Sequence, residues 1–192
     1  PYIAYQTTLR NLFPMRFRDG GTDAFVKRLQ TPALLTRLKR AALAKIDMLG
    51  DWSAVMITRV SKEEHQVHIG KRVSEIVAES KEDPFEFVRQ LLINENGSVG
   101  MVGFGMSEEE IKSVLTHPLV MIASDGGAAA TYGPLSEITP HPRYYGTFPR
   151  VLGKYCRDNH FFDLPTAVHK MTGMPAQRLG LKDRGKVDVG LA

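Results

Sequence analysis

The stretch Ser107–Ala123, SEEEIKSVLTHPLVMIA, decides the expected fold. Ser107 and Glu110 have the spacing of a capping box, which predicts a helix that begins at Glu108 and ends near His117. The run Leu119–Ala123 is continuously apolar, as in strands that are buried on both faces of a parallel sheet. A helix followed by a fully buried strand predicts an α/β fold.

Upstream of this stretch the pattern is mainly helical. Residues 10–97 contain two helix-start signals, Thr31–Pro32 and Asp83–Pro84, in which a capping side chain precedes a first-turn proline. Between them, Trp52–Val60 is rich in β-branched residues and predicts a short strand. Residues 1–9 indicate the end of a strand that passes into a loop.

Glycines and helix caps set the expectations for the rest of the chain. The glycine-rich apolar segment Ser98–Gly105 predicts a strand or an extended segment. Downstream of Ala123 we expect a long loop, then a helix capped by Thr147 and a helix opened by Asp163. A last short helix is expected to open at Met174 and to end at Gly180.

Composition narrows the class of protein. The 192 residues are 43% hydrophobic and 24% charged, which is typical of a globular protein with a sizeable core. No apolar run has the length of a membrane span and no signal-peptide pattern opens the chain, so we expect a cytoplasmic protein without a membrane partner. The net charge of +4 is modest and the basic residues have acidic neighbours, which argues against a nucleic-acid partner. The single cysteine, Cys156, excludes an intrachain disulfide.

Asp125 is the residue most suited to chemistry. It follows the expected buried strand, and α/β barrels place their active sites at that end of their strands. A carboxylate there can bind a metal or take a proton from a metal-bound water, but from the spacing alone an aspartate that caps a helix or orders a loop is the better interpretation. The spacing of His65 and His68 also fits two metal ligands on one helical face, but solvated polar side chains are the better interpretation.

Longer segments resemble a known family. They are MIASDG at Met121–Gly126, HPR at His141–Arg143, YGTFPRVLG at Tyr145–Gly153, PYIAYQTTL at Pro1–Leu9 and KMTGMPAQRLGL at Lys170–Leu181. Together they resemble the N-acyl-D-amino-acid deacylase (D-aminoacylase) branch of the amidohydrolase superfamily, over nearly the whole chain. The segment HPR-x-x-GTFPR is the most specific of them.

The resemblance implies the C-terminal portion of a metal-dependent hydrolase with a (β/α)8 TIM barrel, from the end of strand 7 through helix 8. Residues 1–9 would be the end of strand 7 and its loop, and residues 10–97 a mainly helical insertion subdomain. Residues 98–180 would hold strand 8, at Leu119–Ala123, with its flanking helices and the active-site loop. Residues 181–192 would begin the return to a β-sandwich domain.

The resemblance also implies roles for particular residues. Asp125 would be the strand-8 aspartate, a ligand in a zinc site of one or two metal ions and the general base that activates the hydrolytic water. Arg143 would bind the α-carboxylate of an N-acyl-D-amino acid, and Tyr2 and Gly126 would also contact this small-molecule substrate. The family's histidine ligands lie upstream of Pro1, so we expect that this chain alone does not assemble the metal site.

Two alternatives remain open at this point. A cyclic amidohydrolase of the dihydroorotase or hydantoinase kind shares the barrel and the aspartate, but has no evident need for the HPR-x-x-GTFPR segment. The chain as given would otherwise be a catalytically inert fragment or an interaction module formed by the helical insertion. A piece of a barrel leaves sheet edges and apolar faces uncovered, so self-association of the isolated chain is expected.

Overall fold

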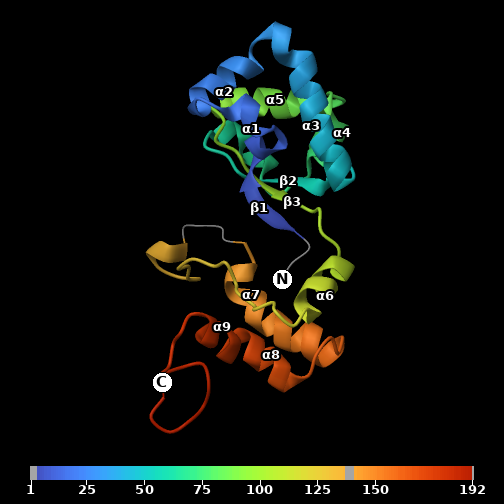
Figure 1. Ribbon diagram of the computed structural model, residues 1–192. Coiled ribbons are helices and arrows are strands. Elements are labelled where there is room, and N and C mark those ends of the chain that lie inside the picture. The colour runs from blue at the N-terminus through green and yellow to red at the C-terminus, as the bar shows by residue number, and fades with distance from the viewer. Residues whose placement is uncertain (1–3, 137–140, 192) are drawn as a thin grey trace. The chain divides into compact units, whose positions relative to one another are not determined.

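A computed structural model describes residues 4–136 and 141–191 (Figure 1). Tyr2 therefore lies outside the described residues. The chain divides into two compact units, one of residues 4–105 and one that contains the residues from Met106 onward. Each unit has its own hydrophobic core.

The first unit combines a small sheet with five helices. Its elements are β1 (Tyr5–Thr8), α1 (Met15–Arg18), α2 (Gly21–Leu29), α3 (Leu35–Leu49), β2 (Val55–Arg59), α4 (Val73–Ser80), α5 (Pro84–Asn94) and β3 (Gly100–Gly103). Short 3₁₀ turns at Leu9–Leu12, Pro32–Leu34, Trp52–Ala54 and Glu63–His68 connect them. The expected strands in 52–60 and 98–105 are thus present.

The sheet is antiparallel and has the order β1-β3-β2. Tyr5 is opposite Gly103 and Thr8 is opposite Gly100, and Val55 is opposite Gly103 on the other side. Two glycines allow this close packing, because a Cβ on Gly103 would lie 2.6 Å from Cζ of Tyr5, and one on Gly100 would lie 2.8 Å from Oγ1 of Thr58. The sheet joins residues that the sequence analysis assigned to three different segments, namely 1–9, 10–97 and 98–180.

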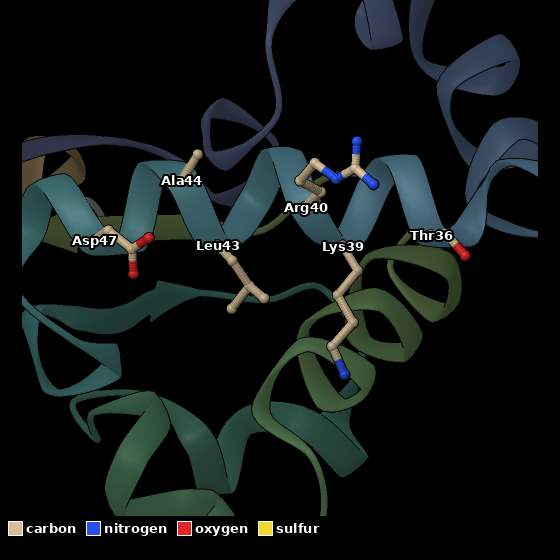
Figure 2. Close-up of a pocket in the computed structure, with 6 residues that line it drawn as sticks. All are labelled: Thr36, Lys39, Arg40, Leu43, Ala44 and Asp47. Atoms are coloured by element: carbon tan, nitrogen blue, oxygen red, sulfur yellow. The ribbon is translucent and has the colours of Figure 1, made fainter.

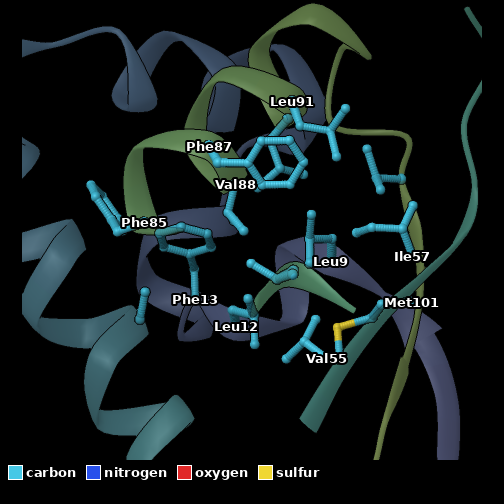
Figure 3. Packing of buried hydrophobic residues seen from close by; sticks show 14 of the residues in the cluster. Leu9, Leu12, Phe13, Val55, Ile57, Phe85, Phe87, Val88, Leu91 and Met101 are labelled. Atoms are coloured by element: carbon cyan, nitrogen blue, oxygen red, sulfur yellow. The ribbon is translucent and has the colours of Figure 1, made fainter. Parts of the chain in front are cut away.

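The helices cover the sheet through a continuous apolar core (Figure 3). Phe13 lies at its centre, with its ring centroid 5.3 Å from that of Phe25 and 6.4 Å from that of Phe85. Edge-to-face rings of this kind add to the free energy of burial. The other labelled residues of the cluster are Leu9, Leu12, Val55, Ile57, Phe87, Val88, Leu91 and Met101.

The helix start at Asp83 is confirmed, whereas Thr31 behaves differently. The Asp83 carboxylate accepts a hydrogen bond from the backbone N–H of Glu86 at 3.0 Å, and Pro84 occupies the first turn of α5. Thr31 precedes a 3₁₀ turn and its side chain makes no capping bond. Its hydroxyl instead donates to the carbonyl oxygen of Lys27 at 2.7 Å, because that carbonyl lies at the open C-terminal end of α2.

Asp83→Ala is expected to lower the free energy of unfolding by about 1 kcal/mol, the usual cost of losing an N-cap side chain. The same change removes the exposed ion pair with Lys39 at 2.9 Å, which adds little. Urea denaturation of the two proteins measures the difference. The neighbouring exposed carboxylate provides the control, and Glu82→Ala is expected to leave the unfolding midpoint unchanged. Equal midpoints for Asp83→Ala and the unmodified protein would contradict the capping role.

The second unit is helical in its described residues. It contains α6 (Glu108–Thr116), a 3₁₀ turn at Pro134–Ser136, α7 (Arg143–Arg150), a π-helical segment (Val151–Asp158), α8 (Leu164–Met171) and α9 (Gly173–Arg178). The capping box before α6 is confirmed, since the Ser107 hydroxyl accepts from Glu110 N–H at 3.2 Å and the Glu110 carboxylate accepts from Ser107 N–H at 2.7 Å. The Asp163 carboxylate caps α8 through the N–H of Thr166.

The expected strand at Leu119–Ala123 is not formed, because nothing in the described residues pairs with it as a neighbouring strand. Lys170 holds this part of the chain instead. Its ammonium group donates to the carbonyl oxygens of His117 at 2.6 Å and Val120 at 2.9 Å, and its own carbonyl accepts from Ile122 N–H at 3.0 Å. Burial lowers the pKa of Lys170. The structure therefore contains both helices and strands, and its described residues do not form the expected part of a barrel.

The helix that Thr147 was expected to cap, beginning at Phe148, begins five residues earlier, so that expectation was wrong. Arg143 is the first residue of α7, and Gly146 N–H already donates to the carbonyl oxygen of Pro142 at 2.9 Å. The imidazole Nδ1 of His141 accepts from Arg143 N–H at 3.0 Å, which satisfies an amide that a helix start otherwise leaves open. Thr147 consequently lies inside the helix, where it is buried.

Candidate active site

The structure brings Asp125 and Arg143 together. Arg143 Nη2 lies 3.0 Å from Oδ2 of Asp125, and Arg143 Nε donates to the backbone carbonyl oxygen of Asp125 at 3.0 Å. The Asp125 side chain is 89% exposed and that of Arg143 is 24% exposed. A guanidinium group that uses two of its N–H groups on one residue holds that residue in a defined orientation.

The backbone at Asp125 and Gly126 has a restricted geometry. Asp125 has a φ of +48°, in the left-handed region that aspartate tolerates better than most residues. A Cβ on Gly126 would lie 3.2 Å from both the Cα of Tyr144 and the Oγ of Ser124, so this position has little room for a side chain. The two residues therefore shape the loop that faces the start of α7.

Arg150, from the same specific segment as Arg143, is part of a cluster around Glu108. One Glu108 oxygen lies 3.1 Å from Arg150 Nη2 and 2.6 Å from Lys154 Nζ, and the other accepts from the Tyr155 hydroxyl at 3.1 Å. Burial raises the pKa of Glu108, but the hydrogen bonds and the charges of these neighbours outweigh burial and leave the pKa below its ordinary value. This cluster fastens α6 to the helix that begins with Arg143.

The sequence places Glu108 in the first turn of α6 and indicates no further role for it. Its partners follow more than 40 residues later, and no local spacing reveals such a contact. Tyr145 and Phe148, which belong to the same segment, have exposed side chains. The cluster gives the segment a structural role that is separate from the contact between Arg143 and Asp125.

The two histidines of the first unit, His65 and His68, were interpreted as metal ligands or, better, as solvated side chains. The structure shows a third arrangement. His65 is 12% exposed and is therefore not a solvated side chain. Its Nδ1 lies 2.5 Å from Oε1 of Glu95, whose side chain is fully buried and also accepts from the N–H groups of Ser61 and Lys62. The His68 ring stacks on the His65 ring with their centroids 6.2 Å apart. The pKa of His68 is lowered mainly by burial and further by the charges of His65 and Lys71.

A complete metal site is not present in residues 4–136 and 141–191, where no group of three or more His, Cys, Asp or Glu side chains is arranged to hold a metal ion. The exposed carboxylate of Asp125 is an oxygen donor of the type that zinc accepts, but structural and catalytic zinc sites use three or four protein ligands. Asp125 is therefore suited to supply one ligand of a metal site. The described residues do not supply the other ligands.

No helix in the described part of the chain is both long and apolar enough to cross a membrane.

Comparisons with known proteins identify relatives among the amidohydrolases. The chain is 40% identical to a D-aminoacylase of Alcaligenes xylosoxydans xylosoxydans and 36% identical to an N-acyl-D-glutamate deacylase of the same organism, in each case over 121 residues. These matches cover 63% of this chain and 22% of each relative, so the chain spans about a fifth of the length of the curated relatives it matches. No protein-family model matches the chain.

Solved structures lead to the same relatives. A crystal structure of D-aminoacylase, described as defining a novel subset of amidohydrolases, has a TM-score of 0.60 and 30% identity, and the match covers 99% of this chain and 30% of that one. N-acyl-D-glutamate deacylase from Bordetella bronchiseptica, complexed with zinc and a phosphonate inhibitor, has a TM-score of 0.62 and 27% identity with the same coverage.

The class to which these relatives belong is the amidohydrolases. The particular relatives are D-aminoacylase and N-acyl-D-glutamate deacylase, so the resemblance to the N-acyl-D-amino-acid deacylases is confirmed. The comparisons do not favour the cyclic-amidohydrolase alternative.

Proposed function

We propose that this chain is part of a metal-dependent amidohydrolase that hydrolyses the amide bond of N-acyl-D-amino acids. The contact between Asp125 and Arg143 carries the proposal. In an N-acyl amino acid only a few bonds separate the amide that is cleaved from the α-carboxylate. A general base and a carboxylate-binding cation must therefore lie close together, as these two side chains do.

In this proposal Asp125 accepts a proton from the attacking water and delivers it to the leaving amine when the C–N bond breaks. Arg143 binds the substrate carboxylate, for which a planar guanidinium group is well suited. Gly126 and Tyr2 contact the substrate. Zinc, when bound, supplies a Lewis acid that polarises the acyl carbonyl, and Asp125 contributes one of its ligands. The other ligands come from outside this chain.

The barrel belongs to the same proposal. We assign residues 1–9 to the end of strand 7, residues 10–97 to the helical insertion, residues 98–180 to strand 8 with its flanking helices, and residues 181–192 to the return into a β-sandwich. The barrel would supply the neighbouring strands that Leu119–Ala123 lacks in the described residues. A cytoplasmic location, the lack of membrane and nucleic-acid partners, and self-association of the isolated chain remain predictions.

Zinc content and hydrolysis of a panel of N-acetyl-D-amino acids test the proposal. Both are measured on this 192-residue chain and on a protein extended upstream by the missing barrel strands. We expect only the extended protein to bind zinc and to hydrolyse the D-substrates. Stoichiometric zinc and turnover by the short chain would contradict the assignment of the remaining ligands, and an inactive extended protein that binds zinc would contradict the proposed substrate.

Arg143→Lys in the extended protein is expected to raise KM roughly tenfold with a small change in kcat, since lysine keeps the charge and loses the paired N–H groups. Steady-state kinetics with an N-acetyl-D-amino acid measure the effect. Arg157, an exposed arginine paired with Asp158 at 2.7 Å, provides the matched control, and Arg157→Lys is expected to leave both constants unchanged. An unchanged KM in Arg143→Lys would contradict the carboxylate-binding role.

A further inference from the structure

Positive charge is concentrated in the first part of the first unit. Residues 4–45 contain nine lysines and arginines and two acidic residues. Residues 46–105 contain six lysines and arginines and ten acidic residues. Eight of the nine cations lie in α1, α2 and α3. The net charge of +4 for the whole chain conceals this asymmetry.

Several of these cations have partners within the unit. Lys39 pairs with Asp83 at 2.9 Å, and Arg28 donates to backbone carbonyls of the α1 region. Arg10 donates to the Thr22 hydroxyl, and Arg18 donates to the side-chain oxygen of Asn11. These side chains are used in holding the helices together.

Arg16, Arg37 and Arg40 differ from these four cations. In the described part of the chain none of the three has a carboxylate partner within 4.0 Å, and all three are exposed. They line one open pocket of about 240 Å³ together with Phe17, Ala41 and Ala44. No acidic residue of the described chain lines this pocket. Arg16 Cζ lies 5.3 Å from the Phe17 ring centroid, a cation–π contact that orients this arginine.

α3 contributes Arg37, Arg40, Ala41 and Ala44 to this pocket, whereas the buried residues of α3 are Leu38, Ala42 and Ile46. Figure 2 shows the Arg40 and Ala44 side chains on one side of α3 and those of Lys39 and Leu43 on the other. The neighbouring pocket drawn there contains Asp47 and the Lys39 that pairs with Asp83, so its cations are partly balanced. Arg40 and Ala44 line both pockets, but the three unbalanced arginines share only the smaller one.

We propose that the pocket of Arg16, Arg37 and Arg40 binds a phosphate dianion, either free phosphate or a phosphate monoester. The two oxygens of a carboxylate cannot accept hydrogen bonds from all the N–H groups of three guanidinium groups. A phosphate has more oxygens and a second negative charge. The volume suits a small ligand. Arg37 and Arg40 are three residues apart on α3 and repel each other, so a bound dianion stabilises the helix as well. This site does not depend on the proposed hydrolase activity.

Isothermal titration of the chain with inorganic phosphate and with phenyl phosphate, at constant ionic strength in chloride, tests the proposal. We expect saturable binding of one phosphate group per chain and a rise in the thermal unfolding midpoint. Tighter binding of phenyl phosphate than of inorganic phosphate identifies the ligand as a phosphate monoester whose organic group contacts Phe17, Ala41 and Ala44. Equal affinities identify free phosphate as the ligand.

Two variants locate the site. Arg37→Gln combined with Arg40→Gln is expected to weaken phosphate binding at least tenfold, roughly the loss of one or two charge-assisted hydrogen bonds. Lys45→Gln removes a cation from the same helix outside the pocket and is expected to change the affinity less than about twofold. Equal weakening in both proteins, unchanged binding in the double variant, or no saturable binding by the unmodified chain would overturn the proposal. Because the three arginines are exposed, circular dichroism of the variants is expected to match that of the unmodified chain.

Discussion

Replacing Asp125 with asparagine in the extended protein is expected to lower kcat for N-acyl-D-amino acids by roughly 10²- to 10⁴-fold, the usual contribution of a general acid or base. Asparagine keeps the size of the side chain but does not accept the proton of the attacking water. Folding is expected to be unaffected, because the Asp125 side chain is largely exposed and its ion pair is with Arg143. Steady-state kinetics and thermal unfolding of the same preparations separate the two effects.

The second unit contains a matched control for this change. Asp158 is also an exposed aspartate paired with an arginine, at 2.7 Å from Arg157, and Asp158→Asn is expected to leave kcat unchanged. A similar loss of activity in both variants would show a general effect of removing surface carboxylates. Full activity in Asp125→Asn would remove Asp125 from the mechanism, and with it the contact that supports the role of Arg143.

Replacing Glu95 with alanine is expected to lower the free energy of unfolding by roughly 3 to 5 kcal/mol, as for other buried pairs that lose one partner. The change leaves the His65 ring and the N–H groups of Ser61 and Lys62 without their acceptor inside the first unit. Urea denaturation measures the loss. Glu63→Ala, at an exposed glutamate of the same region, is expected to change the free energy of unfolding by only a few tenths of a kcal/mol.

The same carboxylate makes the stability depend on pH. Burial raises the pKa of Glu95, but hydrogen bonds from His65, Ser61 and Lys62 outweigh burial and leave the pKa below its ordinary value of 4.5. The contribution of a carboxylate with a lowered pKa is present above its ordinary value and is lost as the pH falls through the value in the folded protein. The difference in stability between the unmodified chain and Glu95→Ala is therefore expected to shrink below pH 4.5. A difference that is constant down to pH 2 would contradict the ionised form of Glu95.

Local chemistry allowed parts of the fold to be predicted from the sequence. The starts of α5, α6 and α8 depend on a side chain that accepts a hydrogen bond from the amide three residues ahead, so their positions follow from a few neighbouring residues. The short strands within 52–60 and 98–105 follow from β-branched residues and glycines for the same reason.

Features that depend on distant residues could not be predicted in this way. The pairing of Tyr5 with Gly103 joins residues almost 100 positions apart, and the contact of His65 with Glu95 spans 30 positions. The apolar run Leu119–Ala123 suits a buried strand, but a strand also needs hydrogen-bonding neighbours, which sequence composition does not supply. One family resemblance implies the roles of both Asp125 and Arg143, and the contact between the two side chains is information that only the structure adds.

The left-handed backbone at Asp125 limits which substitutions this position accepts. Glutamate has the same charge and is commonly regarded as a conservative change, yet it lacks the short side chain that lets aspartate adopt a φ of +48°. Asparagine and glycine fit the backbone but have no charge. In the proposed mechanism the backbone conformation and the chemistry each require aspartate, and a search of random variants at this position should recover aspartate alone when both folding and turnover are demanded.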